Sequence, residues 1–187
     1  MVKLEKHEKF EEAAKNAAAE FKKIDEKEKI RLISHFDCDG ICSASIMIKA
    51  LKNLDMQYSL SIVQQLSESF IISLSKQDYN YFIFTDIGSG QIELVDKYLK
   101  NKKIFILDHH DFAFSPKDII HLNPHLCGID GGQEISGAGV TYYFTKNITE
   151  TNMAHIAIVG AIGDTQDSNG FSKLNQEILK DSIDQGK

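Results

Sequence analysis

Short apolar runs alternate with longer segments of helical periodicity along most of this sequence, and this alternation constrains the fold more than any other feature. The runs Tyr-Phe-Ile-Phe-Thr at 81–85 and Ile-Phe-Ile-Leu at 104–107 have the length and composition of buried strands. Strands that are separated by helices of about 10–15 residues indicate βαβ units and a parallel sheet. The expected strands are residues 30–34, 58–63, 81–85, 104–107 and 119–122. We therefore predict an α/β fold in which helices flank a parallel sheet of about five strands.

An additional helix is expected before the first strand, over residues 3–29. Its apolar residues recur at helical spacing and are Phe10, Ala14, Ala17, Phe21 and Ile24. Charged residues of both signs fill the opposite face, where i,i+4 pairs support a helix. The stripe predicts a helix that docks on the domain, and an arm that binds a partner is the alternative. The predicted organisation is an amphipathic helix over residues 1–29 and one domain over residues 30–187.

The composition limits the classes of protein that this chain can represent. With 42% hydrophobic and 26% charged residues in a length of 187, it suits one globular domain and not a disordered chain. No apolar run reaches the roughly 18 residues of a membrane span, and the first residues carry no secretory signal. We therefore expect no membrane partner and a cytoplasmic location. The three cysteines form no CxxC pair, which argues against a disulfide framework and a zinc knuckle.

Aspartate and histidine residues follow the ends of several expected elements. They are His35, Asp37 and Asp39 after the first strand, Asp86 after the third, Asp108, His109 and His110 after the fourth, and Asp164 after a late helix. The carboxyl ends of strands in an open α/β sheet lie at one edge, where ligands bind, so these side chains are expected to converge. Carboxylates that are packed together repel one another unless cations neutralise them, and mixed imidazole and carboxylate ligands suit Mn²⁺ and similar ions. Bound cations would also supply positive charge to a phosphate-handling protein whose net charge is −6.

The loop after the first strand has other interpretations. An acid after a strand is often only the N-cap of the next helix, although capping does not explain four such clusters. A calcium EF-hand loop is excluded, because its first and twelfth positions would be His35 and Ile46 instead of acidic residues. The nucleophile loop of a haloacid-dehalogenase-like phosphatase stays an alternative, since Asp-x-Asp-Gly at 37–40 fits it, but Ile41 replaces the usual Thr. Gly40 is expected to allow a sharp turn into the next helix.

Taken together, these residues resemble the DHH phosphoesterase superfamily. The matching motifs are His35-x-Asp37-x-Asp39-Gly40, Asp86, Asp108-His109-His110 and Gly163-Asp164, in the family's order. The compact first motif is similar to that of the RecJ-type nuclease branch, because other branches usually have His-x-x-x-Asp-x-Asp. The stretches 122–125, 134–140 and 163–167 resemble the archaeal RecJ-like group, which includes the GINS-associated nuclease.

The resemblance implies a DHH-type domain over residues 30–187 that holds two divalent cations, Mn²⁺ or alternatively Mg²⁺. The implied metal ligands are His35, Asp37, Asp39, Asp86, His109 and Asp164. Among them, Asp86 is the best candidate to bridge both ions. His110 is implied to be a catalytic residue that contacts the scissile phosphate, and Asp108 to orient a histidine. Ser136 and Gly137 are implied to contact the substrate phosphate or to shape the pocket.

The implied reaction is metal-dependent hydrolysis of a phosphodiester, as by a RecJ-like exonuclease of DNA repair or replication. Its implied partners are single-stranded DNA or RNA, or an oligonucleotide, and replication proteins such as GINS. Three alternatives stay open: a DHH phosphodiesterase on short oligonucleotides, cyclic dinucleotides or pyrophosphate, a non-catalytic replication-associated scaffold, and the haloacid-dehalogenase-like phosphatase. Family members normally continue into a DHHA1 domain with a Gly-Gly-His motif. No such run occurs here, so the resemblance implies a truncated chain, and whether this part is active alone is an open question.

Overall fold

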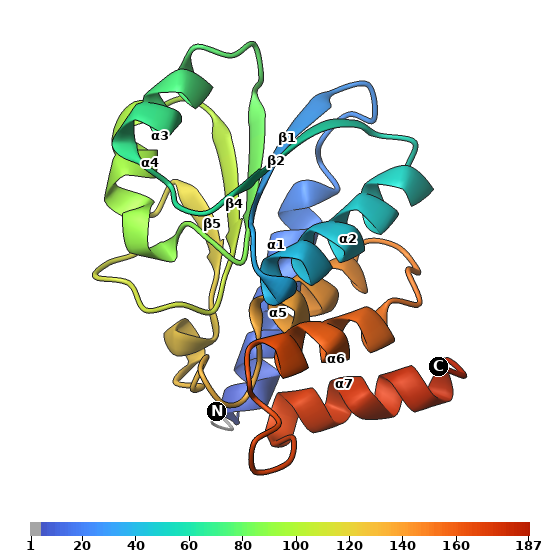
Figure 1. The fold of residues 1–187 in the computed structure, drawn as a ribbon. Coiled ribbons are helices and arrows are strands. Elements are labelled where there is room, and N and C mark those ends of the chain that lie inside the picture. Colours follow the sequence, from blue (N-terminus) through green and yellow to red (C-terminus); the bar gives the residue numbers. More distant parts are fainter. Residues whose placement is uncertain (1–4) are drawn as a thin grey trace.

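A parallel five-stranded sheet forms the centre of the computed structural model, which describes residues 5–187 (Figure 1). The strand order is β2-β1-β3-β4-β5, and every neighbouring pair is parallel. The strands are β1 (Lys29–His35), β2 (Gln57–Val63), β3 (Tyr81–Thr85), β4 (Lys103–Leu107) and β5 (Ile119–Leu122). Each lies within one residue of its predicted ends, so the predicted α/β fold with a parallel sheet is confirmed.

Helices cover both faces of this sheet (Figure 1). They are α1 (Lys6–Phe21), α2 (Cys38–Asn53), α3 (Glu68–Ser75), α4 (Ile92–Tyr98), α5 (Gly137–Thr145), α6 (Ala154–Gly163) and α7 (Lys173–Asp184). α3 and α4 lie on one face and α1, α2 and α5 on the other, while α6 packs on α2 and α5, and α7 packs on α6. β3 serves both layers because its side chains alternate: Phe82 and Phe84 face α3 and α4, and Ile83 faces the opposite layer. No helix within residues 5–187 is long and apolar enough to cross a membrane.

Helix α1 buries its apolar stripe in the domain core. Phe10 makes an edge-to-face contact with Tyr143, with 5.6 Å between the ring centroids. Phe21 makes the same kind of contact with Phe144 at 5.8 Å. The helix therefore docks on the domain, as its stripe predicted.

Local hydrogen bonds end α1 earlier than its charge and apolar pattern predicted. The helix stops at Phe21 instead of continuing to residue 29. Beyond it, the Asp25 side chain accepts a hydrogen bond from the backbone N–H of Lys27 at 2.9 Å, which offers the chain an alternative to the helix. Residues 1–4 of the predicted segment lie outside the described residues.

The apolar periodicity of residues 41–54 predicts a helix that begins at residue 41, whereas helix α2 begins earlier, at Cys38. Asp37 is the N-cap, because its carboxylate accepts a hydrogen bond from the N–H of Gly40 at 2.9 Å. The shift places Asp39 inside the first turn of the helix, directly at the edge of the sheet.

Candidate metal centre

Loops from the carboxyl ends of three strands meet the end of one helix at a single edge of the sheet. His35 is the last residue of β1, Asp86 directly follows β3, and His109 follows closely after β4. The fourth contribution comes from the helical layer, because Asp164 caps the carboxyl end of α6. The main chain fixes these positions, for example through the hydrogen bond from the N–H of Asp86 to the carbonyl of Leu107 at 2.9 Å.

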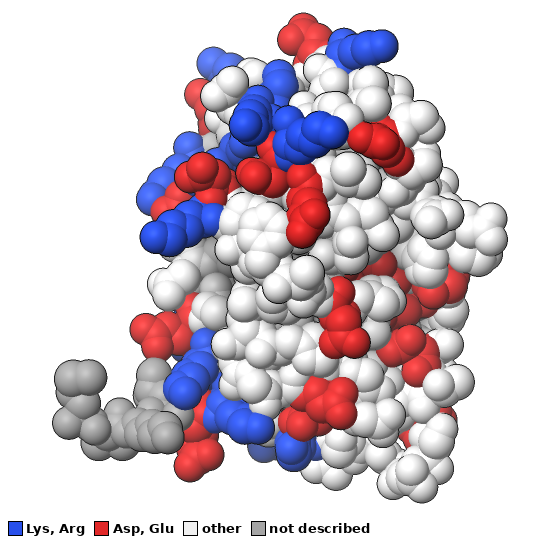
Figure 2. Space-filling model, turned by 90° about the vertical axis from the view of Figure 1, so that its left-hand side faces the viewer, with Lys and Arg blue, Asp and Glu red and all other residues white. Residues whose placement is uncertain are grey.

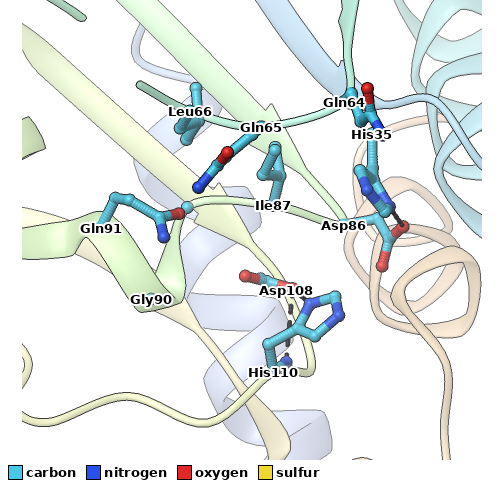
Figure 3. Close-up of a pocket in the computed structure, with 11 residues that line it drawn as sticks. His35, Gln64, Gln65, Leu66, Asp86, Ile87, Gly90, Gln91, Asp108 and His110 are labelled. Carbon is cyan, nitrogen blue, oxygen red and sulfur yellow. Dashed lines mark hydrogen bonds and ion pairs between the residues drawn. The ribbon is translucent and has the colours of Figure 1, made fainter. Parts of the chain in front are cut away.

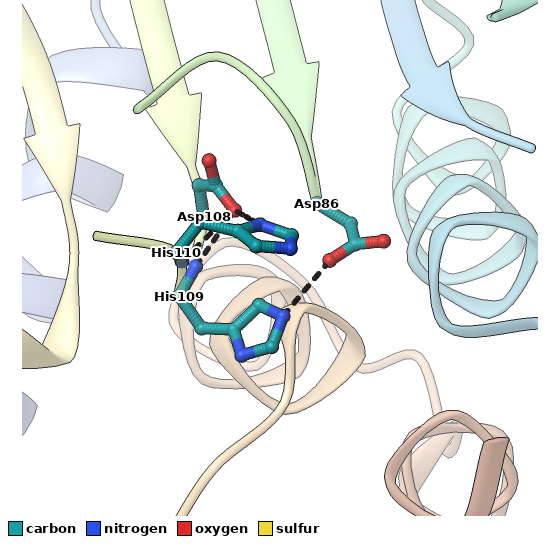
Figure 4. Close-up of side chains that lie close together, drawn as sticks. All are labelled: Asp86, Asp108, His109 and His110. Atoms are coloured by element: carbon teal, nitrogen blue, oxygen red, sulfur yellow. Dashed lines mark hydrogen bonds and ion pairs between the residues drawn. The ribbon is translucent and has the colours of Figure 1, made fainter. Parts of the chain in front are cut away.

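The structure brings all six predicted ligands together in two three-residue groups, beside a third group of candidate ligand atoms from Asp86, Asp108, His109 and His110. One group is His35, Asp37 and Asp86, and the other is Asp39, His109 and Asp164. Within each group the candidate ligand atoms lie within 4.8 Å of one another. Asp86 connects the groups, since its Oδ2 lies 3.6 Å from His35 Nδ1 and its Oδ1 lies 3.2 Å from His109 Nε2 (Figures 3 and 4).

Asp86 is the residue whose surroundings most clearly require a cation. It is 1% exposed, yet neither carboxylate oxygen accepts a hydrogen bond from any residue in 5–187. An ionised group that is buried in this way is costly unless positive charge faces it. Its backbone φ of 56° lies in the left-handed region, which is uncommon for a residue other than glycine and is found at functional sites. The donor set, with carboxylate oxygens between two imidazoles, therefore fits divalent cations on both sides of Asp86.

The amino end of α5 packs against two of the acids. A Cβ atom at Gly137 would lie 2.7 Å from the Cβ of Asp86, so only glycine leaves room for this carboxylate. The N–H groups of Gly137 and Ala138 donate to the Asp39 carboxylate at 2.6 and 2.9 Å. Ser136 is the buried N-cap of α5. Ser136 and Gly137 thus form a buried wall of the centre, and their contact with a substrate phosphate stays a prediction.

His109 is held in one orientation by its other ring nitrogen. Nδ1 lies 2.7 Å from the carbonyl oxygen of Gly131, and because a carbonyl only accepts, Nδ1 carries the hydrogen. Nε2 then faces Asp86 at 3.2 Å and Asp39 at 3.7 Å. Metal-binding histidines are commonly oriented by such a hydrogen bond from the second nitrogen.

A buried glutamine links the second ligand group, and sequence reasoning missed its role. Gln166 donates from its side-chain amide to the Gly131 carbonyl at 2.9 Å and to Asp164 Oδ2 at 2.8 Å. Asn175 fixes this amide by donating to Gln166 Oε1 at 2.7 Å. Gln166 therefore positions Asp164 and also the carbonyl that orients His109. The only signal in the sequence was its place in the stretch Gly-Asp-Thr-Gln-Asp, which does not reveal these partners.

Asp108 and His110 form a pair beside the two ligand groups (Figure 4). Asp108 is fully buried, and its carboxylate accepts hydrogen bonds from His110 Nδ1 at 2.7 Å and from the N–H of Ser89 at 2.9 Å. The histidine that Asp108 orients is therefore His110. The hydrogen bond to Asp108 raises the pKa of His110 and favours its charged form. Half of the His110 side chain stays exposed.

The pKa values show how strongly this cluster attracts positive charge. Burial, together with the charge of Asp86, raises the pKa of Asp39 to about 8. Burial disfavours charge on His109, but the carboxylates of Asp86 and Asp39 outweigh it and raise the pKa of this imidazole to about 10. Burial also opposes the ionisation of Asp86, yet the contacts with His109 and His35 prevail and lower its pKa. Without cations the site therefore holds protons where divalent ions would place positive charge.

Gly40 serves close packing instead of the sharp turn that we predicted. It lies within α2, and its backbone φ is not positive. A Cβ atom at this position would come 2.6 Å from the carbonyl carbon of His35. The hydroxyl of Ser34 donates to the Gly40 carbonyl at 2.7 Å and ties the helix to β1. Glycine is thus required by the contact between α2 and β1, not by a special backbone conformation.

A sequence profile described as the DHH family, N-terminal domain, matches residues 29–163, which is most of the chain. The chain belongs to the DHH family. Membership of this family, with its own arrangement of aspartates and histidines, replaces the haloacid-dehalogenase alternative. It also accounts for the Asp108-His109-His110 triplet, which that alternative left unexplained.

Known proteins of this family resemble the chain over most of its length. It is 39% identical over 160 residues to an uncharacterised protein of Methanocaldococcus jannaschii, a match that covers 82% of this chain and 36% of that protein. It is 26% identical over 165 residues to the single-stranded-DNA-specific exonuclease RecJ of Bacillus subtilis, covering 80% of this chain and 21% of RecJ. The crystal structure of an exonuclease RecJ bound to manganese matches with a TM-score of 0.76 and 19% identity, covering 92% of this chain and 47% of that one. The chain is therefore a DHH domain that is similar to those of RecJ proteins, and it spans a minor part of these curated relatives.

Proposed function

We propose that this domain hydrolyses phosphodiester bonds in single-stranded DNA or RNA in a metal-dependent reaction, as part of a RecJ-like exonuclease. The observation that carries the proposal is the pair of three-residue ligand groups that meet at the buried Asp86 carboxylate. The relatives support it, because the RecJ of Bacillus subtilis is a single-stranded-DNA-specific exonuclease and a RecJ of similar fold is bound to manganese.

Two divalent ions would be held by the two ligand groups. His35, Asp37 and Asp86 would hold one ion, and Asp39, His109, Asp164 and the shared Asp86 the other. We propose Mn²⁺ as the preferred ion and Mg²⁺ as the alternative, because the ligands mix imidazole with carboxylate. When bound, such a pair supplies Lewis-acid stabilisation of the phosphate and a lowered pKa for the attacking water.

His110 would act directly on the substrate. Its Nδ1 donates to Asp108 at 2.7 Å, so Nε2 of the half-exposed ring is free, and in the charged form of the ring the Nε2–H donates to a phosphate oxygen. The hydrogen bond to Asp108 raises the pKa of His110 and so favours the charged imidazole, and a charged donor stabilises the negative charge that develops during displacement. Asp108 is a positioning residue here, because it touches His110 and not the substrate.

In the part of the chain that the structure describes, the face that carries α3 and α4 has no continuous positively charged surface that could bind a nucleic acid strand (Figure 2). Figure 2 shows this face, where blue Lys and Arg side chains lie mixed with red Asp and Glu side chains. One such pair is Lys97 of α4 and Glu68 of α3, whose charged atoms lie 3.6 Å apart. Attraction of a polyanion is weak where charges of both signs alternate. We therefore infer that the substrate strand meets the protein at the metal centre.

The two remaining candidate functions differ in what they require of the same site. A non-catalytic scaffold has no need of six candidate ligands brought together around a buried carboxylate that accepts no hydrogen bond from residues 5–187. A phosphodiesterase for short oligonucleotides or cyclic dinucleotides, or a pyrophosphatase, would use the same centre on another substrate.

The test is a Mn²⁺-dependent assay on labelled single-stranded DNA, single-stranded RNA, a dinucleotide and pyrophosphate. Wild-type protein is compared with Asp86→Ala and with the control Asp118→Ala. Asp118 is an exposed acid that directly precedes the amino end of β5, whereas Asp86 follows the carboxyl end of β3. We expect Asp86→Ala to abolish both hydrolysis and Mn²⁺ binding in calorimetry, while Asp118→Ala behaves like wild type. Undiminished Mn²⁺-dependent cleavage by Asp86→Ala would contradict the proposal.

A further inference from the structure

A cavity of 220 Å³ lies beside the metal centre, and the ligand groups do not account for it (Figure 3). Its walls come from the loop after β2 and the turn after β3. The lining residues from these walls include Gln64, Gln65, Leu66, Ile87 and Gln91. Asp86 and His110 also line the cavity, so it opens directly onto the metal centre. A group that is bound there would lie next to a phosphate held by the metal ligands.

The lining favours an uncharged partner. No lysine or arginine among residues 5–187 lines the cavity, whereas the carboxylates of Asp86 and Asp108 do. A second phosphate would therefore find no lysine or arginine there, and the imidazoles of His35 and His110 are the cationic side chains among the described residues that line the cavity. Carboxamides, in contrast, each offer a donor and an acceptor to a neutral polar group.

The cavity lining combines apolar side chains with carboxamides, a combination that suits a heterocycle. Leu66 and Ile87 are buried apolar side chains that present hydrophobic surface to the cavity. Gln65 and Gln91 extend toward it from opposite walls (Figure 3). Glutamine can pair with a base edge through both atoms of its amide, as it does with adenine. The volume of 220 Å³ is below the about 300–1,000 Å³ of pockets for drug-sized ligands, so it suits one base better than several nucleotides.

We propose that this cavity binds the nucleobase of the nucleotide whose phosphate lies at the metal centre, an inference that rests on the proposed function. Gln65 and Gln91 hydrogen-bond the edge of the base, and Leu66 and Ile87 contact its face. The protein then selects phosphodiesters that carry a base over phosphates that lack one. Pyrophosphate, which leaves the cavity empty, becomes a poor substrate.

The experiment measures binding by NMR on the ¹⁵N-labelled full chain in the presence of Mg²⁺, which is diamagnetic. The probes are 2′-deoxyadenosine 5′-monophosphate and 2-deoxyribose 5-phosphate, which differ only in the base. We expect the nucleotide to shift the side-chain amide resonances of Gln65 and Gln91 and to bind about tenfold more tightly than the sugar phosphate. The Gln65→Leu and Gln91→Leu variants should lower this preference toward unity. The control Gln57→Leu, an exposed residue at the start of β2, should keep it.

Two results would overturn the assignment. One is equal affinity for the two probes, including no binding of either, and the other is a set of shifts that spares the glutamine amides. If a variant does not fold, the comparison of the two probes on the wild-type protein decides. Absence of Mn²⁺-dependent cleavage together with base-dependent binding would contradict the hydrolytic function and support the proposal that the cavity binds a base. Mn²⁺-dependent cleavage together with equal affinity for the two probes would contradict base binding in the cavity and leave the hydrolytic function intact.

Discussion

Alanine in place of Gly137 should disrupt the metal centre without removing any ligand. The added Cβ would lie 2.7 Å from the Cβ of Asp86 and 2.8 Å from its carboxylate carbon. Carbon atoms prefer separations of about 3.5–4.0 Å, so α5 or Asp86 must move by roughly 1 Å. Overpacking of this kind costs about 1–3 kcal/mol, and the better helix propensity of alanine offsets at most about 1 kcal/mol. We expect a loss of roughly 1–2 kcal/mol in the free energy of unfolding, and a loss of about 100-fold in Mn²⁺ affinity as the shared carboxylate is displaced.

The assay is calorimetric titration with Mn²⁺, together with urea unfolding in a chelator. Gly139→Ala is the matched control on the same helix, because its Cβ would lie 2.7 Å from Ile135 Cγ1 and 3.1 Å from Ile178 Cδ1, in the core and away from the centre. It should lower stability by a similar amount and retain the Mn²⁺ affinity of the wild-type protein. If Gly137→Ala binds Mn²⁺ as the wild type does, or if both variants lose affinity equally, the steric argument for Gly137 is refuted.

Three further predictions follow from hydrogen bonds and charges at the same centre. Gln166→Leu should lower Mn²⁺ affinity about 10- to 100-fold, because Gln166 positions Asp164 and the carbonyl of Gly131. The control Gln176→Leu, at an exposed position, should keep the wild-type affinity, and equal titration curves for the two variants would contradict the positioning role of Gln166. His110→Ala should reduce kcat about 100-fold or more and leave Mn²⁺ affinity unchanged, so a variant that instead loses metal would show that this histidine is a ligand. In a chelator, the free energy of unfolding should fall between pH 5.5 and 8.5 by on the order of 1 kcal/mol per pH unit, as followed by urea titration. The reason is that the folded state holds protons on His109 (pKa about 10) and Asp39 (pKa about 8), which the unfolded chain releases at lower pH. A free energy of unfolding that is constant or rises in this pH range would contradict these protonation states.

The strands, and the meeting of the candidate ligands at one edge of the sheet, could be predicted because their signals are local. The run at 81–85 indicates a buried strand without knowledge of its neighbours, and Asp86 comes directly after it. Once a parallel sheet is inferred, its carboxyl ends must share an edge, which brings Asp86 and His109 together from residues that are far apart in the sequence. The same reasoning failed to locate helix ends, because the Asp37 cap and the Asp25 turn depend on single hydrogen bonds and not on periodicity.

The residues that position the candidate ligands could not be predicted, because their hydrogen-bond partners lie far away in the sequence and follow no periodic spacing. Gln166 bonds to a carbonyl 35 residues earlier, in a loop without a periodic pattern. Gly40 was attributed to a turn, because nothing in the sequence reveals its approach to the carbonyl group of His35. Asp39 was predicted as a ligand, but its two hydrogen bonds to the start of α5 appear only once the helical layer is assembled.

The candidate ligands come from four well-separated segments between His35 and Asp164, and this dispersal would link cation binding to the integrity of the entire domain. An unfolded chain cannot present these groups to one ion, so binding selects the native state and shifts the folding equilibrium by mass action. At a free cation concentration one hundred times its Kd, each occupied site adds about 2.7 kcal/mol to the resistance against denaturation. Melting temperature at graded Mn²⁺ concentrations should therefore report on occupancy, and chelation should increase the susceptibility of this domain to proteolysis.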